Sequence, residues 1–268
     1  MNSLTIEDIE HLDEKGYVVK ENFFSKIDAH NLTYHTRRLL SLLSGPEFEE
    51  ALSSHVWAVE VDAKTTRKNF FTIQSSEFGR VFYNDHNVIT RHTPSAPQDE
   101  INKFNATYIE NRGSRGWDKG MYVITYPTKP DPLCKFNGLK LPDVEPIVEL
   151  LSKFYKDEYH LASLKVYVND SIKNTRDFHR DTTEKTPRNK KMKAFVYLTH
   201  VFDIDSGPYS YIEGTHKDYN LKESDGPEKV FLGPAGTLIL SNQNGLHRGQ
   251  PQQQDRSRVV LVFNLFTK

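Results

Sequence analysis

The chain has 268 residues, which suits one large domain with a sizeable core, and its 35 Lys and Arg against 36 Asp and Glu leave a net charge of −1. This balance creates no overall field for a polyanion, so nucleic acid and anionic membranes are not expected partners. The single cysteine, Cys134, excludes an internal disulfide. The N-terminus lacks the basic and apolar regions of a signal peptide, and no apolar stretch approaches the roughly 18 residues of a membrane span. We therefore expect a cytoplasmic protein.

The N-terminal region contains two helix signals around a short strand. A capping pattern at Thr5 predicts a helix that ends at Gly16, and the apolar run 17–19 predicts a strand. A second capping pattern at Ser25 opens a helix that should end near Gly45. Both helices carry an apolar face that can be buried against a sheet.

The middle of the chain is less regular. Between residues 46 and 111, strands are predicted only at Val56–Val61 and Phe70–Ile73, and Arg80–Pro97 has the composition of a loop. After a turn cluster, Met121–Tyr126 again predicts a strand. An amphipathic helix is predicted from Val144 to Phe154, because its apolar residues recur at helical spacing.

Short β-like runs follow from Leu161 to the C-terminus, and turn sequences rich in Gly, Pro and Asp separate them. This pattern is typical of a sandwich or jelly-roll barrel. The predicted class is therefore mainly β with flanking helices, in one domain over residues 1–268. Most of the metal-binding jelly roll would lie in 161–268, and residues 1–160 would form helical support and a substrate-shaping region.

The chain contains three His-x-Asp triplets: His11 with Asp13, His179 with Asp181, and His216 with Asp218. Two residues apart on a strand share one face, whereas on a helix they point about 200° apart and cannot share a metal. The first triplet lies in a predicted helix. The third remains an alternative pair, but only the middle one lies between two predicted strands.

A second imidazole, His247, follows a strand-like run and precedes another. Two imidazoles and one carboxylate form the facial triad that suits ferrous iron with open positions for substrate and oxygen. The sequence therefore predicts His179, Asp181 and His247 as metal ligands and catalytic residues. His200 and His216 are interpreted as structural or surface groups.

Three stretches carry a wider pattern: Leu4-Thr5 to Phe23-Phe24-Ser25; Phe178-His179-Arg180-Asp181 with Asp205-Ser206-Gly207-Pro208 and Gly214-Thr215-His216-Lys217; and His247 with Arg258. Together they resemble the phytanoyl-CoA dioxygenase family of Fe(II) and 2-oxoglutarate dependent oxygenases. The resemblance implies a double-stranded β-helix, which is a cupin-like jelly roll. It also implies oxidation of a small molecule by O2, typically a hydroxylation, coupled to decarboxylation of 2-oxoglutarate to succinate.

The resemblance gives Arg258 the role of binding 2-oxoglutarate, and Arg256 is the alternative because a two-residue separation predicts it on the same strand face. Other candidates for the pocket are alternating residues of the preceding strand and two polar residues near His247, although the opposite strand parity is equally compatible with the sequence: Lys165, Tyr167, Asn169, Thr237 and Asn242. The resemblance does not cover residues 46–118, a region that usually shapes the substrate site in this family.

The stretch Thr182–Lys191 carries four cations against one acid and has no apolar anchor. It is either a solvated loop or a lid whose charge would attract an anionic substrate. Two other functions stay open at this point: an iron dioxygenase that does not use 2-oxoglutarate, and a catalytically silent jelly-roll binding module. The sequence predicts no oligomeric state.

Overall fold

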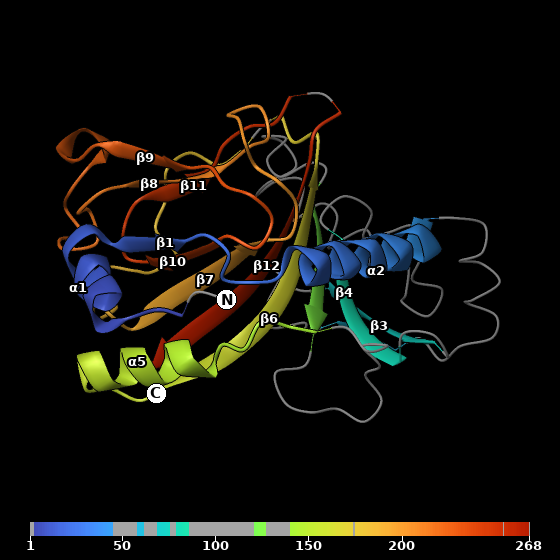
Figure 1. Cartoon of the computed structure of the whole chain (residues 1–268), viewed down its shortest axis with the longest axis horizontal. Helices are drawn as coiled ribbons and strands as arrows, with labels where there is room; N and C mark the ends of the chain where they lie inside the picture. Colours follow the sequence, from blue (N-terminus) through green and yellow to red (C-terminus); the bar gives the residue numbers. More distant parts are fainter. Residues whose placement is uncertain are drawn as a thin grey trace.

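The computed structural model describes residues 3–44, 58–61, 69–75, 79–85, 121–126, 140–173, 175–253 and 255–267. Within these residues, nine strands form one antiparallel sheet in the order β1-β10-β7-β12-β6-β5-β4-β3-β2 (Figure 1). The bounds of these strands are Tyr17–Lys20 (β1), Ala58–Val61 (β2), Asn69–Ser75 (β3), Gly79–Asp85 (β4), Met121–Tyr126 (β5), Tyr159–Asp170 (β6), Lys191–Tyr197 (β7), Leu238–Asn242 (β10) and Ser257–Thr267 (β12).

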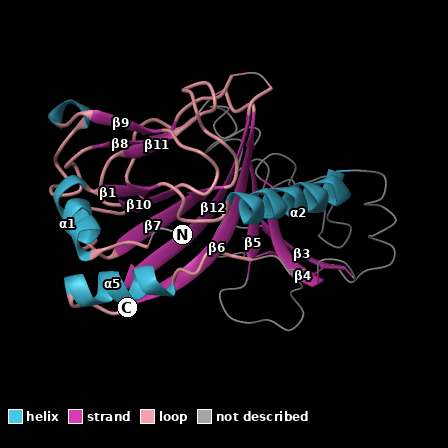
Figure 2. Cartoon of the chain, viewed as in Figure 1, coloured by secondary structure: helices cyan, strands magenta, loops and turns pink. Residues whose placement is uncertain are grey.

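A second sheet of three described strands has the order β11-β8-β9, with β8 at Tyr209–Ile212, β9 at Glu228–Phe231 and β11 at His247–Gly249. The helices are α1 (Ile6–Lys15), α2 (Lys26–Ser44) and α5 (Glu145–Tyr155), with a 3-10 turn at Glu223–Asp225. In Figure 2, α1 and α5 lie at the left of the molecule, and α2 lies across the strands on the right. Among the described helices, none has the length and apolar character needed to cross a bilayer.

The core consists of two layers on opposite faces of the large sheet. On β12, Leu261 and Phe263 pack with buried residues of α1, α2 and α5, whereas Val260 and Val262 pack with aromatic residues of the small sheet. Alternate residues of a strand point to opposite faces. A strand covered on both faces therefore needs an almost continuous apolar run, and β12 supplies one from Val259 to Phe263.

The two N-terminal helix predictions are confirmed. The Thr5 amide donates to Asp8 Oδ2 at 2.8 Å, and Gly16 ends α1 with a φ of 94° while its amide donates to Leu12 O at 2.8 Å. A φ in this range strains any residue with a side chain. The helix α5 and the strands β3 and β5 lie where the sequence predicts them, and the described part of Val56–Val61 is β2.

The prediction of a loop over Arg80–Pro97 is wrong for its first six residues. Residues 80–85 belong to β4, which pairs with β3 on one side and β5 on the other. The stretch lacks the alternation of a half-buried strand, and its hydrogen bonds come from neighbours that are distant in the sequence. Residues 86–97 lie outside the described part. The N-terminal half supplies β1 to β5 of the large sheet.

Candidate metal centre

The two imidazoles of the predicted triad are joined through their backbones. His179 and His247 form an isolated antiparallel bridge in which each amide donates to the carbonyl of the other at 3.0 Å. His247 opens β11, so the bridge attaches the 175–181 segment to the small sheet. The bridge therefore fixes the backbone positions of both histidines relative to each other, and Asp181 lies two residues after His179.

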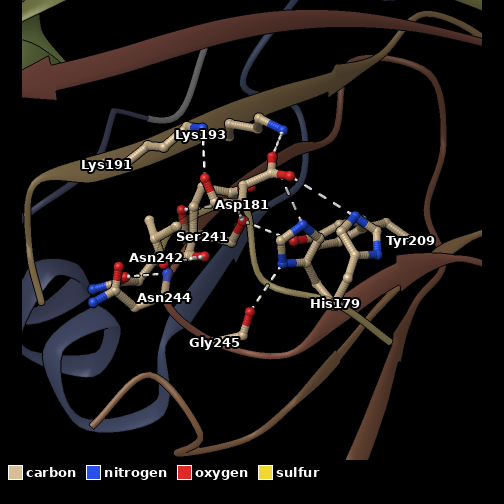
Figure 3. Close-up of polar contacts among 12 residues, drawn as sticks. His179, Asp181, Lys191, Lys193, Tyr209, Ser241, Asn242, Asn244 and Gly245 are labelled. Carbon is tan, nitrogen blue, oxygen red and sulfur yellow. Dashed lines mark hydrogen bonds and ion pairs between the residues drawn. The ribbon is translucent and has the colours of Figure 1, made fainter. Parts of the chain in front are cut away.

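The side chains of His179, Asp181 and His247 converge on one point, and Figure 3 shows His179 and Asp181 on either side of it. His179 Nε2 lies 3.8 Å from Asp181 Oδ1, and His247 Nε2 lies 4.0 Å from Asp181 Oδ2. One potential ligand atom from each residue falls within 4.8 Å of the others, and no second group of this kind occurs in the part of the chain that the structure describes. A single ion could be bound by all three residues.

The ring nitrogens that face away from this point are fixed by main-chain carbonyls. His179 Nδ1 lies 2.9 Å from Asp177 O, and His247 Nδ1 lies 2.9 Å from Gly245 O. Because a carbonyl only accepts, both Nδ1 atoms must carry the proton. Both Nε2 atoms are then lone-pair donors directed at Asp181, which is the usual arrangement for imidazole ligands.

The electrostatics also suit metal binding. Burial lowers the pKa of His247 to about 3, and burial lowers the pKa of His179 as well, so both rings are neutral at pH 7. Burial alone would raise the pKa of Asp181, but the charge of Lys193 and a hydrogen bond from Lys193 outweigh it. The net pKa lies well below its usual range. Neutral imidazole and ionised carboxylate are the ligand forms that bind a divalent cation.

A cavity of about 290 Å³ lies beside the triad, which is near the lower end for a small-molecule site. Its lining residues come from both sheets and the segments between them: Tyr167, Asn169, Ile172, Thr175, Arg176, His179, Asp181, Lys193, Phe195, Tyr197, Tyr209, His247, Gly249, Gln250, Gln252, Arg258, Val260 and Val262. Of the candidates predicted on β6, Tyr167 and Asn169 line it and Lys165 does not.

Arg258 is the lining residue whose donors most clearly lack a partner. Its Nε and Nη1 atoms are buried and form no hydrogen bond with any residue that the structure describes, and burial lowers the pKa of the guanidinium. Asn169, its partner across β6 and β12, also has a buried Oδ1 without a partner. The buried donors of Arg258 are costly unless a ligand accepts from them. An anionic group in the cavity would satisfy them.

Arg256, the alternative, lies in a different environment. It precedes β12 rather than sharing a strand face with Arg258, its side chain is 50% exposed, and it forms an ion pair of 3.4 Å with Asp203. Thr237 is buried and is not a lining residue. Asn242 donates to Asn189 Oδ1 at 3.0 Å and likewise does not line the cavity.

The other histidine candidates lie apart from the triad. His200 Nδ1 accepts from the Ala235 amide at 3.2 Å, and exposed His11 packs edge-on against Tyr17 with ring centroids 5.6 Å apart. His216 is buried, with Nε2 3.0 Å from Asp13 O, whereas Asp218 is exposed. The structure therefore assembles the middle His-x-Asp pair with His247 and leaves the third pair apart.

His216 leads to a pH prediction for the metal-free protein. Burial lowers its pKa to about 4, while an unfolded histidine titrates near 6.5, so between these values the unfolded chain binds a proton that the folded one excludes. The His216 contribution should lower the free energy of unfolding by about 2 kcal/mol from pH 7 to pH 5. Denaturant unfolding at both pH values should show that His216→Asn loses about 2 kcal/mol less of its free energy of unfolding than the unchanged protein does. An equal loss in the two proteins would contradict the prediction.

The basic loop Thr182–Lys191 is bound to the body of the protein. Arg188 pairs with Asp13 of α1 at 3.0 Å, and Lys190 pairs with Asp157 at 2.7 Å. No residue from 182 to 191 lines the cavity. Two of the four cations of this loop are thus paired with acids of neighbouring segments, and its contacts give no support to a charged lid.

Sequence reasoning missed Lys193, which lines the cavity and contacts Asp181 Oδ2. Alternation could have suggested it, because Lys193, Phe195 and Tyr197 share one face of β7 and all three line the cavity. Gln250 was also missed. Its Nε2 donates to Ser210 Oγ at 3.0 Å, and nothing in its local sequence indicates a lining residue.

Comparison with known proteins gives the fold. No protein-family model matches this chain, and no curated protein matches it. Among solved structures, it is similar to the non-heme alpha ketoglutarate dependent epimerase SnoN from nogalamycin biosynthesis, with 12% identity over 97% of this chain and 81% of that one and a TM-score of 0.50. It is also similar to AviO1 from Streptomyces viridochromogenes Tue57, with 12% identity over 99% of this chain and 96% of that one and a TM-score of 0.51. Apo HygX from Streptomyces hygroscopicus is similar as well, with 11% identity over 99% of this chain and 87% of that one and a TM-score of 0.50.

These similarities confirm the predicted fold, a mainly antiparallel cupin-like jelly roll. At such identities they extend no further than the fold. The narrower resemblance to the phytanoyl-CoA dioxygenase family has no matching family model and remains a prediction.

Proposed function

We propose that this protein is a ferrous iron and 2-oxoglutarate dependent oxygenase that acts on a small molecule. One observation carries the proposal: a ligand-ready His-Asp-His triad and the unpartnered donors of Arg258 line the same cavity. The triad suits iron with open positions. The guanidinium suits the far carboxylate of a dicarboxylate, because its planar fork matches two carboxylate oxygens.

His179, Asp181 and His247 would hold the metal, and Arg258 would hold the far carboxylate of 2-oxoglutarate. When bound, iron and 2-oxoglutarate supply the oxidising chemistry: O2 delivers one oxygen atom to succinate, with release of CO2, and the other to substrate oxidation. Apolar residues such as Val260 and Val262 line part of the cavity and limit water there. A hydroxylated product is the simplest outcome, although the similar SnoN is described as an epimerase.

The test is an anaerobic titration followed by turnover. Protein with ferrous iron should develop a weak visible charge-transfer band when 2-oxoglutarate is added, and succinate should form once air is admitted. Screening candidate metabolites for faster succinate release would then identify the substrate. Oxygen uptake that needs iron but not 2-oxoglutarate would favour an iron dioxygenase that binds its substrate directly. Absence of metal binding would favour a silent binding module.

Gly249 provides a prediction about the position of Arg258. A Cβ at residue 249 would lie 3.3 Å from Arg258 Nη2, which is closer than ordinary contact, so the guanidinium would have to shift. Since two-point binding depends on its position, Gly249→Ala should weaken 2-oxoglutarate binding roughly fivefold, equivalent to about 1 kcal/mol, with metal affinity unchanged. Calorimetric titration of the Mn²⁺-loaded proteins measures both; equal 2-oxoglutarate affinities would contradict the prediction.

A further inference from the structure

Asp181 is held by two lysines of one strand. Lys193 Nζ contacts Asp181 Oδ2, and Lys191, two residues earlier on β7, donates from Nζ to the main-chain oxygen of Asp181 at 2.9 Å. Figure 3 shows both lysines reaching Asp181 from β7, on the side away from the imidazoles. One lysine therefore fixes the carboxylate, and the other fixes the backbone that carries it.

The contact with Lys193 makes the two carboxylate oxygens inequivalent. Oδ2 is engaged by an ammonium group whose side chain is only 17% exposed, whereas no hydrogen bond to Oδ1 is found among the described residues. Oδ1 lies 3.8 Å from His179 Nε2 and Oδ2 lies 4.0 Å from His247 Nε2, so both oxygens border the point on which the triad converges, and the contact with Lys193 distinguishes them. An ion pair this buried is a poor source of stability compared with apolar packing, so its position invites a functional explanation.

A carboxylate can bind a divalent cation through one oxygen or through both. A facial triad leaves three positions open when each residue supplies one atom, and a carboxylate that bound through both oxygens would fill one of them. A 2-oxo acid chelating through two oxygens needs two open positions, and O2 needs the third. The binding mode of Asp181 thus decides whether both co-substrates fit.

We propose that Lys193 is a positioning residue that restricts Asp181 to a single metal-binding oxygen, Oδ1, and so keeps the third position open. The proposal rests on the function proposed above. Lys193 acts through Asp181 and does not touch the metal. Lys191 stabilises the same residue through its backbone, and it serves as a matched control because it leaves both carboxylate oxygens alone.

The experiment uses Mn²⁺ alone as the probe and counts the water molecules bound to it, from the broadening of its electron paramagnetic resonance signal in ¹⁷O-enriched water. Mn²⁺ on the unchanged protein and on Lys191→Met should hold three waters, one for each open position. Lys193→Met should hold two, and its affinity for 2-oxoglutarate should fall about tenfold. Lys193→Arg, which keeps a charged donor, should restore three.

The outcomes separate this inference from the proposed function. If the unchanged protein binds no Mn²⁺ at the triad, the proposed function itself fails. If Lys193→Met retains three waters and full 2-oxoglutarate affinity, or loses Mn²⁺ altogether, the role assigned to Lys193 is wrong. Should Lys193→Met fail to fold, Lys193→Gln, a weaker and neutral donor, is expected to lower the water count in the same way, and three waters on it would also overturn the inference.

Discussion

Replacing Asp181 by alanine is expected to abolish the visible charge-transfer band that the protein should show with ferrous iron and 2-oxoglutarate in the absence of oxygen. Loss of groups that merely support a metal ligand already weakens metal binding about 10- to 100-fold, and the ligand itself should matter more. Succinate formation should disappear with the band. His179→Ala and His247→Ala should behave in the same way, because each removes one of three converging ligand atoms.

The control is Asp218→Ala, which tests the other His-x-Asp pair. Asp218 is exposed and its carboxylate accepts from the Asn220 amide at 2.9 Å, so the band and the turnover should be unaffected. Thermal melting of metal-free Asp181→Ala shows whether Lys193, deprived of its acceptor, destabilises the fold. A band that survives in Asp181→Ala but vanishes in Asp218→Ala would mean that Asp218, with His216, binds the metal and that the assignment of Asp181 is wrong.

Replacing Arg258 by methionine is expected to change binding and stability in opposite directions. Each charge-assisted hydrogen bond lost to the far carboxylate should cost about 1.5 to 3 kcal/mol, so 2-oxoglutarate should bind roughly 10- to 150-fold more weakly for each bond. In the ligand-free protein, removal of the buried Nε and Nη1 donors should raise the free energy of unfolding by about 1 kcal/mol. Titration calorimetry and denaturant unfolding measure the two effects.

The matched control is Arg256→Met. Its ion pair with Asp203 is about half exposed, and exposed pairs contribute under about 1 kcal/mol. We expect unchanged 2-oxoglutarate binding and a small loss of stability. A larger loss of binding at Arg256 than at Arg258 would reverse the assignment. A loss of stability in ligand-free Arg258→Met would mean that the guanidinium stabilises the empty site.

The elements that the sequence predicts well are those with local causes. The capping contacts of Thr5 and the left-handed turn at Gly16 bound α1 whatever lies elsewhere in the chain, and helical spacing defines α5 in the same way. The metal triad is similar: a two-residue separation on extended backbone places His179 and Asp181 together, and only His247 has to arrive from a distance.

The features that escaped prediction depend on pairing between distant strands. β4 is a strand because β3 and β5 lie on either side of it. Register also decides which part of a strand reaches the cavity. Tyr167 and Asn169 line it, yet Lys165, on the same face of β6, lies beyond it. The contact between Lys193 and Asp181 arises because the turn after Asp181 returns as β7, and no local pattern encodes that return.

The backbone bridge between His179 and His247 has a consequence for competition among metal ions. The bridge and the carbonyl contacts of both Nδ1 atoms hold the imidazoles in place through the protein's own hydrogen bonds. A site assembled in advance offers every divalent cation the same ligands, and the affinity of such ligands generally rises from Mn²⁺ through Fe²⁺, Co²⁺ and Ni²⁺ to Cu²⁺. Iron would then be selected by its supply in the cell, and traces of nickel, copper or zinc would inhibit the purified protein by displacing it.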